Sequence, residues 1–275
     1  MNFIEILKAI FFGIVEGITE WLPISSTGHM ILLDAFIKLN VSAEFLEMFL
    51  VVIQLGAILA VVVLYWKKLF PFTTHEKYFI KKNIMIMWLK IIVACIPAAI
   101  VGLIWEDVID QLFYNYQTVA IALIVFGLLF IGIEKTHKGK IAKINSIDAI
   151  TFKTAFLIGL FQLVAAIFPG TSRSGATILG GLMLSLSRTV AAEFTFFLAV
   201  PVMFGASLLK IVKFGLDFSA DEIGILTSGL ISAFAVSIFA IKFLIGYIQK
   251  NDFKIFGWYR IVLGILVLVY FGFFN

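Results

Sequence analysis

The chain has 275 residues, of which 62% are hydrophobic and 14% charged, and its formal net charge is +4 at pH 7. This composition excludes an ordinary soluble globule, and the modest charge, with no basic stripe, excludes a nucleic-acid-binding surface. Several apolar runs have roughly the 17 to 25 residues that a helix needs to span a bilayer. Because these runs do not alternate polar and apolar residues, the sequence predicts an all-α integral membrane protein rather than a β-barrel.

The predicted elements fall into two kinds. Six apolar runs are unbroken and are predicted to be full transmembrane helices, whereas two others are interrupted in the middle by proline, glycine and hydroxyl residues. In chain order they are an interrupted stretch over 3–39, full spans over about 45–66, 84–105 and 117–133, a second interrupted stretch over 152–187, and full spans over 191–209, 223–246 and 258–274.

The interruptions read LPISSTGH in the first stretch and FPGTSRSG in the second. Proline cannot continue helical hydrogen bonding and glycine loosens it, so each stretch is predicted to fold as helix, turn and helix. If the first stretch crossed the bilayer twice, its turn would lie at the surface and Glu16 and Glu20 would face lipid. A hairpin that dips into the membrane and returns instead lets its turn line a protein-walled cavity. We therefore expect two re-entrant hairpins.

Loop charges predict the orientation. Lysines gather in the connections 67–82 and 135–143 and around Lys250 and Lys254, with Arg260 beside them. Since positive loops stay in the cytoplasm, this pattern predicts that both termini lie outside. The loops on the opposite side are predicted to carry Glu106, Asp107, Asp110, Asp217, Asp221 and Glu222.

The two halves of the chain resemble each other. Lys8–Thr27 aligns with Thr154–Arg173, which pairs Pro23 with Pro169. Three full spans, an odd number, are predicted between these prolines, so the two hairpins enter from opposite faces and meet tip to tip. Such inverted repeats are common in transporters, with sites near the membrane midplane. The predicted repeats are residues 1–133 and 150–275 of a single membrane domain, and their alignment pairs Ser26 with Ser172.

The second tip has the composition of an anion site. Its free backbone N–H groups, its hydroxyls, the Arg173 guanidinium and the positive end of the following helix suit a phosphate. An arginine at the centre of a membrane helix costs about 2.5–3.5 kcal/mol, so Arg173 is expected to have a role. The alternative is an ion pair with a glutamate that only staples the hairpins together. Candidate binding residues of this tip are Gly170, Thr171, Ser172 and Ser174.

The first tip carries acid–base groups. Glu16 and Glu20 are four residues apart and therefore lie on one helix face. A hydroxyl near an imidazole and a carboxylate is the arrangement of an activated nucleophile, and His29 could instead protonate the leaving oxygen. The alternatives are protonated glutamates that only pack between helices and a histidine that only packs. The hydroxyl residues of this tip are Ser25, Ser26 and Thr27, of which Ser25 and Thr27 are candidates for binding the substrate.

The paired carboxylates also bear on a cofactor. Two ionised carboxylates beside a diphosphate would repel it strongly in a low dielectric. Either one of them is protonated, or a divalent cation bridges carboxylate and phosphate oxygens. We favour the cation and expect Mg²⁺ or Ca²⁺, which both prefer oxygen ligands, held by Glu16 and Glu20.

The segments EGITE, PISSTGH and PGTSRSGAT resemble the motifs of the bacterial undecaprenyl-diphosphate phosphatase family, also called the bacitracin-resistance or BacA family. The resemblance covers essentially the whole chain. It implies hydrolysis of a C55 polyprenyl diphosphate to the monophosphate carrier lipid of cell-wall synthesis, and with it bacitracin resistance. It also implies a divalent-cation requirement, a plasma-membrane location and a site open to the outer face. It carries catalytic roles over to Glu16, Glu20, Ser26, His29 and Arg173, and it adds Thr177 to the binding residues.

Rival functions remain at this stage. A lipid-phosphate flippase or secondary transporter is the main alternative, because inverted repeats with paired hairpins also build alternating-access machines. An intramembrane serine protease is disfavoured, since Arg173 would have no role in it. The sequence leaves open whether Ser26 or an activated water attacks, which metal binds, and the oligomeric state, for which a homodimer is one possibility.

Overall fold

A computed structural model describes residues 3–73, 79–137 and 139–273. Over these residues the fold is all-α, as predicted, and contains no β-strand element. Within the same residues, six helical segments are long and apolar enough to cross a membrane, α3 and α4 together forming one of them. The helices are α1 (Phe3–Thr19), α2 (Ser26–Phe36), α3 (Ala43–Val52), α4 (Gln54–Leu64), α5 (Trp66–Leu69), α6 (Lys82–Phe113), α7 (Tyr116–His137), α8 (Phe152–Ile167), α9 (Arg173–Met183), α10 (Arg188–Phe214), α11 (Ala220–Ile248) and α12 (Lys254–Phe273).

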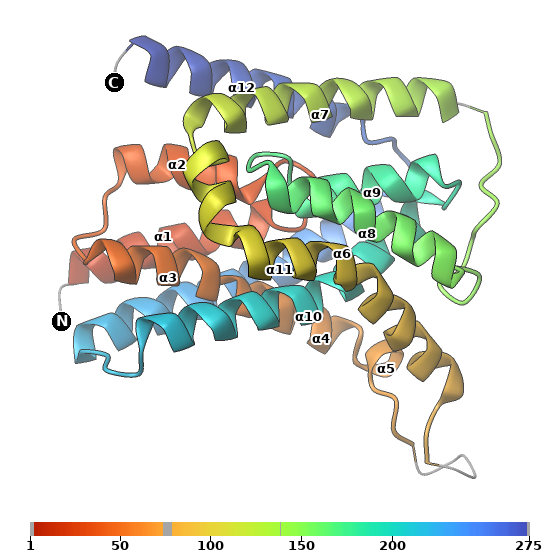
Figure 1. Cartoon of the computed structure of the whole chain (residues 1–275), viewed down its shortest axis with the longest axis horizontal. Helices are drawn as coiled ribbons and strands as arrows, with labels where there is room; N and C mark the ends of the chain where they lie inside the picture. Colours follow the sequence, from red (N-terminus) through yellow and green to blue (C-terminus); the bar gives the residue numbers. More distant parts are fainter. Residues whose placement is uncertain (1–2, 74–78, 138, 274–275) are drawn as a thin grey trace.

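The predicted spans are all present, and the largest difference is in α6. The sequence predicts that this span ends near residue 105 and that Glu106, Asp107 and Asp110 lie in a loop, which is wrong. The helix bends at Trp105, where φ is −124° and ψ is 16°, and then continues to Phe113. Glutamate is a good helix former, so an acidic segment can remain helical where it leaves the apolar layer. The bend turns the last part of α6 toward the start of α7 (Figure 1).

Two helical hairpins reach into the middle of the bundle from opposite ends. In Figure 1, α1 runs inward from the end where both termini lie and α2 returns to it, while α8 and α9 do the same from the other end. The spanning helices run between the two ends. This arrangement is consistent with re-entrant hairpins, and the division into repeats 1–133 and 150–275 stays a prediction.

Both returning helices, α2 and α9, begin with a serine N-cap in a strained backbone conformation. Ser25 and Ser172 have positive φ angles of 73° and 68°, a strained conformation for residues other than glycine. Each side chain caps its helix by accepting a hydrogen bond from the N–H three residues on, at 3.3 Å from Gly28 and 3.1 Å from Gly175. The caps therefore make Ser25 equivalent to Ser172, one residue away from the pairing that the sequence alignment gives. Consequently Ser26 and Arg173 occupy equivalent positions, each the first residue of its helix.

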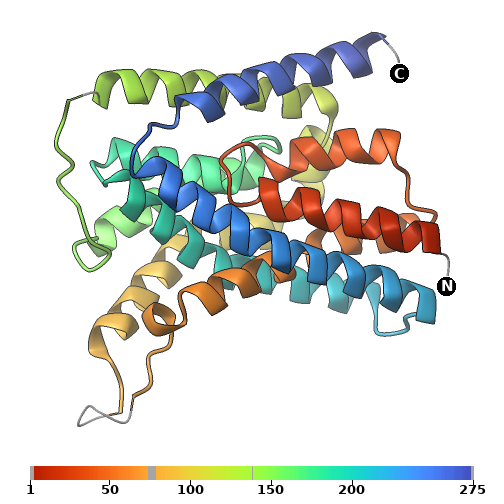
Figure 2. The same ribbon diagram turned by 180° about the vertical axis from the view of Figure 1, so that it is seen from behind.

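Backbone-to-backbone packing holds the hairpins in place. A Cβ atom at Gly17 of α1 would lie 2.8 Å from the carbonyl oxygen of Ala233 on α11, and one at Gly159 of α8 would lie 2.3 Å from that of Ala94 on α6. Neither position has room for a side chain, so each hairpin lies directly against a long spanning helix. Figure 2 shows α1 running beside α11.

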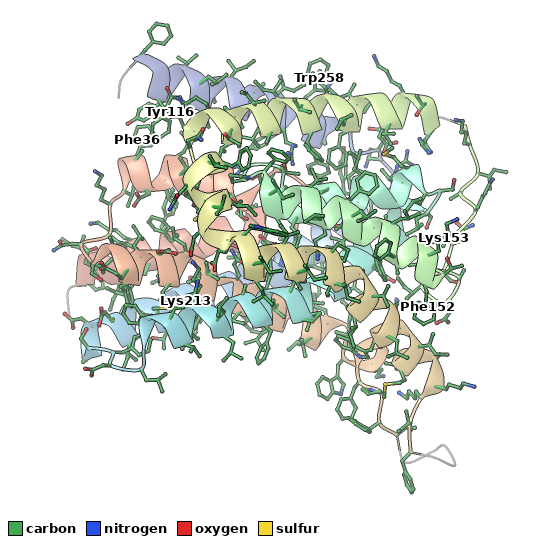
Figure 3. The ribbon with its side chains drawn as sticks, viewed as in Figure 1. Phe36, Tyr116, Phe152, Lys153, Lys213 and Trp258 are labelled. Carbon is green, nitrogen blue, oxygen red and sulfur yellow. The ribbon has the colours of Figure 1, made fainter. Side chains whose placement is uncertain are left out.

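Apolar side chains cover the outer faces of the bundle. Leu103 is 73% exposed and Phe239 is 74% exposed, and many other large apolar side chains are exposed as well. The surface of a soluble protein seldom exposes so many large apolar side chains. Figure 3 shows Phe36 and Tyr116 at the end where the termini lie, and Phe152 and Lys153 at the opposite end. Aromatic and basic residues at both ends of an apolar band mark the two membrane interfaces. The chain is therefore a multi-pass membrane protein.

Candidate active site

The two tips meet through Glu20, which follows the end of α1. Its Oε1 accepts a hydrogen bond from Nη2 of Arg173 at 2.7 Å, and its Oε2 accepts one from Oγ of Ser26 at 2.9 Å. Its backbone carbonyl accepts a third from Oγ of Ser174 at 2.9 Å. A carboxylate from one hairpin thus binds the guanidinium of the other hairpin and the first hydroxyl of its own returning helix.

The ion pair between Arg173 and Glu20 is the staple that the sequence leaves open as an alternative. Arg173 has further donors, however. Its Nη1 donates to the carbonyl oxygen of Thr195 at 3.1 Å, while its Nε is buried and has no hydrogen-bond partner among the described residues. The first N–H groups of α9 also lack partners within the helix. Donors therefore remain at this tip for an anion.

Glu16 lies one helical turn before Glu20 and is fully buried. Within the described chain, neither of its carboxylate oxygens has a hydrogen-bond partner. Buried polar groups in folded proteins are nearly always satisfied, and an unsatisfied one needs an explanation such as an unoccupied ligand position. Glu16 is thus the group of this site that most clearly lacks something to bind.

A cavity of about 240 Å³ lies against both tips. Ser26 lines it and also binds Glu20, so this hydroxyl connects the cavity to the ion pair with Arg173. The bend in α6 brings Asp110 and Tyr114 to the same wall. The lining residues are Glu16, Ser26, Thr27, Met30, Leu50, Val51, Gln54, Ile109, Asp110, Tyr114, Ala165, Ala166 and Pro169.

His29 points toward α12 and has a partner for each ring nitrogen. Its Nδ1 lies 2.6 Å from the carbonyl oxygen of Ser25, which can only accept, so Nδ1 carries a hydrogen. Its Nε2 lies 2.7 Å from the hydroxyl of Tyr259, and the two rings are stacked at 5.6 Å. His29 does not line the cavity, so the packing arrangement is present and its catalytic role stays a prediction.

The other hydroxyls predicted to bind substrate mostly shape the tips. Ser174 and Thr177 are buried, and Oγ1 of Thr177 donates to the carbonyl oxygen of Arg173 at 2.9 Å and bonds Thr195 at 2.8 Å. Thr171 is also buried, and its Oγ1 has no partner in the described part of the chain. The remaining candidates shape the turns. Ser25 and Ser172 are the two helix caps, and Gly170 has a φ of 90°. Of the predicted binding hydroxyls, Thr27 lines the cavity.

Sequence reasoning missed Asp110, Tyr259 and Arg260. The prediction that Arg260 belongs with the charged cytoplasmic loop is wrong, because its side chain is fully buried and donates to backbone carbonyls of both tips. The available signal was its place six residues into the apolar helix α12, where a charge is costly. Gln54 also lines the cavity.

The oxygen atoms at this cavity are of the kind that a hard divalent cation prefers as ligands. The free carboxylate of Glu16 supplies two oxygens, and the cavity wall adds the carboxylate of Asp110 and the hydroxyls of Ser26 and Thr27. No group of three or more His, Cys, Asp or Glu side chains that could hold a metal occurs among the residues that the structure describes. Mg²⁺ is commonly held by one or two carboxylates together with substrate phosphates and water, which suits such a sparse set.

Comparison with known proteins identifies close relatives. The sequence profile of the family described as bacitracin resistance protein BacA matches residues 9–266. The undecaprenyl-diphosphatase of Desulfitobacterium hafniense is 68% identical over 272 residues, which are 99% of this chain and 98% of the relative. Undecaprenyl-diphosphatase 1 of Clostridium acetobutylicum is 67% identical over 271 residues, 98% of this chain and 99% of the relative. An undecaprenyl-diphosphatase of Enterococcus faecalis is 58% identical over 98% of each chain.

Proposed function

Because the chain belongs to the bacitracin resistance protein BacA family, we propose that the two tips form the place where it hydrolyses the terminal phosphate of undecaprenyl diphosphate. The chain is a membrane-embedded phosphatase of polyprenyl diphosphates, and its product is the monophosphate carrier lipid. The observation that supports this location is the contact of Glu20 with both Arg173 and Ser26, because Ser26 also lines the cavity. The flippase alternative has no support from the relatives, whose names all describe a diphosphatase.

In the proposed reaction Ser26 attacks the terminal phosphorus. Its Oγ already donates to Glu20, which takes the proton as the bond from oxygen to phosphorus forms. The bond from phosphorus to the bridging oxygen breaks, and undecaprenyl phosphate leaves with that oxygen and takes up the proton from Glu20. Glu20, ionised again, accepts a proton from the water that attacks the phosphoserine. The bond between phosphorus and Oγ of Ser26 then breaks, Oγ regains the proton from Glu20, and inorganic phosphate leaves. Water activated directly by Glu20 would use the same geometry without a covalent intermediate.

Arg173 stabilises the charge on the phosphoryl oxygens in this scheme. A phosphate in the cavity competes with Glu20 for the guanidinium, and multiply charged oxyanions bind guanidinium groups strongly. As Arg173 turns to the phosphate, the Oε1 oxygen of Glu20 loses its cation and Glu20 becomes a better proton acceptor. Substrate binding itself therefore prepares the base.

The test of the function is phosphate release by the purified protein in detergent, with a C55 diphosphate as substrate. Hydrolysis needs no second compartment, whereas transport does. Release of one inorganic phosphate per lipid, with undecaprenyl phosphate as the other product, is expected. Intact diphosphate after prolonged incubation with the folded protein would overturn the proposal.

Glu16 is proposed to hold Mg²⁺ or Ca²⁺, with Glu20 nearby. Both carboxylate oxygens of Glu16 lack hydrogen-bond partners among the described residues, whereas both oxygens of Glu20 already accept hydrogen bonds. When bound, the cation would neutralise diphosphate oxygens that otherwise face a carboxylate. We expect a chelator to abolish phosphate release and added Mg²⁺ or Ca²⁺ to restore it. In Glu16→Gln, the cation concentration for half-maximal rate should rise about tenfold or more, the usual cost of disturbing a metal shell.

Glu5→Gln is the matched control for this experiment. Glu5 is also a buried glutamate of α1, but its carboxylate already binds Lys8 at 2.8 Å and the backbone N–H of Asn40 at 2.8 Å. Its replacement should leave the cation dependence unchanged. Equal activity of the wild-type protein with and without chelator would contradict the metal proposal while leaving the function intact.

Tyr259 is expected to be a minor contributor through His29. A single neutral hydrogen bond contributes about 0.5–1.5 kcal/mol, so Tyr259→Phe should lower kcat by less than about tenfold. His29→Ala removes the ring and both of its hydrogen bonds, so it should lower kcat further. The measurement is steady-state kcat of the two variants. A loss of about a hundredfold in Tyr259→Phe would mean that the hydroxyl takes part in proton transfer.

We also propose that both termini and the α1–α2 hairpin face the outside of a bacterial plasma membrane. The lysine-bearing connections between α5 and α6, between α7 and α8 and between α11 and α12 all lie toward the end opposite the termini in Figure 1. Positive residues remain on the cytoplasmic side, which supports this orientation. The cavity, whose wall includes the outer turns of α6, would then be reached from the outer face.

A further inference from the structure

Arg260 of α12 lies behind the two tips and is fully buried. Its Nη1 donates to the carbonyl oxygen of Pro23 in the first tip at 3.2 Å. Its Nη2 donates to the carbonyl oxygens of Gly170 and Thr171 in the second tip, at 3.0 Å and 2.7 Å. One guanidinium therefore bridges the backbones of two hairpins that come from opposite ends of the molecule.

This arginine differs from the other two of the chain. Arg173 pairs with Glu20 and Arg188 pairs with Glu134, but among the described residues Arg260 forms no ion pair. Besides the tips, its neighbours are the ring of Phe126, 5.7 Å from the guanidinium carbon, and the carbonyl of Leu123, 3.5 Å from Nε. A buried charge without a counter-charge is expensive, and a neutral side chain would avoid that cost.

The geometry needs a guanidinium rather than any cation. Its planar fork presents donors in fixed directions, so it can hold carbonyl groups on two separate segments at once, which a lysine ammonium cannot do in the same way. The fit is close as well, because a Cβ atom on Gly175 would lie 2.9 Å from Nη1 of Arg260. Helix α9 therefore begins directly against this guanidinium.

The bridged carbonyls lie next to the proposed reacting groups in the sequence. Pro23 follows Glu20 by three residues, and Thr171 precedes Arg173 by two. We propose that Arg260 is a positioning residue, which fixes the two tips relative to each other and thereby sets Glu20 and Ser26 against Arg173. This inference rests on the proposed function of that site. It predicts that loss of the bridge lowers the rate of the chemical step even in protein that is correctly folded.

Arg260→Lys tests the inference, with Arg260→Gln as a second variant and Arg188→Lys as the matched control. Because a misplacement of about 1 Å can cost about a hundredfold in rate, we expect kcat per folded molecule of Arg260→Lys to fall about 10- to 100-fold, with a smaller change in KM. Arg260→Gln should fall at least as far. Arg188→Lys alters an arginine that holds Glu134 at the other end of the bundle, so its kcat per folded molecule should match that of the wild type.

A lower melting temperature with wild-type kcat in the folded fraction of either Arg260 variant would overturn the inference, because it would show a purely structural residue. A double variant adds a second readout. If Arg260 acts by placing Arg173, the cost of Arg260→Lys should shrink in an Arg173→Lys background, since residues that act as a unit are not additive. If the rate losses of the two single variants simply multiplied in the double variant, the inference would also be overturned. Wild-type protein that releases no phosphate would contradict the proposed function instead.

Discussion

The Arg173→Ala variant is expected to release phosphate about a thousandfold more slowly than the wild type, or not at all. Arg173 is the cation that the second tip brings to Glu20, and removing a guanidinium that stabilises a phosphoryl transition state costs on the order of 10³–10⁵ in rate. The variant should still insert and fold, because Ser174 and Arg260 continue to join the tips. The measurement is kcat on a C55 diphosphate, with a melting curve to establish folding.

Arg173→Lys separates charge from geometry in the same assay. Lysine keeps the positive charge but cannot contact Glu20 and the carbonyl of Thr195 through separate nitrogens, as Arg173 does. Its activity should fall between that of the wild type and that of the alanine variant. If Arg173→Ala retained a tenth of the wild-type rate, Arg173 would be only the staple between the hairpins, and the phosphate would have to be bound elsewhere.

Ser26→Ala is expected to lower kcat by about a thousandfold or more if Ser26 is the nucleophile, the scale seen when a catalytic serine is removed. The fold should persist because Ser25, not Ser26, caps helix α2. Thr27→Ala is the matched comparison, since Thr27 lines the same cavity and supplies a hydroxyl for binding rather than for attack. Its loss of kcat should therefore be much smaller than that of Ser26→Ala.

Acid quenching of the wild-type enzyme with substrate labelled on the terminal phosphate gives the second measurement for Ser26. Label that remains covalently attached to Ser26 supports the phosphoserine route. Substantial turnover by Ser26→Ala, with no labelled protein in the wild type, would assign the attack to water with Glu20 as its base. That outcome changes the mechanism and keeps the site.

Much of this site could be predicted because polar residues inside apolar runs are conspicuous. The proline and hydroxyl breaks located both hairpins, and the parity of the spans between them brought their tips together, so that the acidic first tip was expected to face Arg173. Arg260 could not be found in this way, because a single basic residue near a lysine-bearing loop reads as a surface charge. Its role depends on carbonyl groups of three other segments, which only the folded backbone brings within reach.

The remaining differences come from local backbone geometry. The bend at Trp105 keeps α6 helical through an acidic segment, and so Asp110 reaches the cavity wall instead of a loop. The caps at Ser25 and Ser172 pair the two hairpins one residue away from the pairing that the sequence alignment gives. Neither effect changes the apolar pattern from which spans are predicted.

The equivalence of Ser26 and Arg173 bears on the ancestry of the molecule. Both are the first residue after the strained serine, and both contact the same carboxylate, Glu20. Two identical copies of the hairpin would present either a pair of hydroxyls or a pair of guanidiniums, and neither pair could combine attack with charge neutralisation. If the halves arose by duplication, divergence at this one position gave one hairpin a hydroxyl for attack and the other a guanidinium for charge neutralisation.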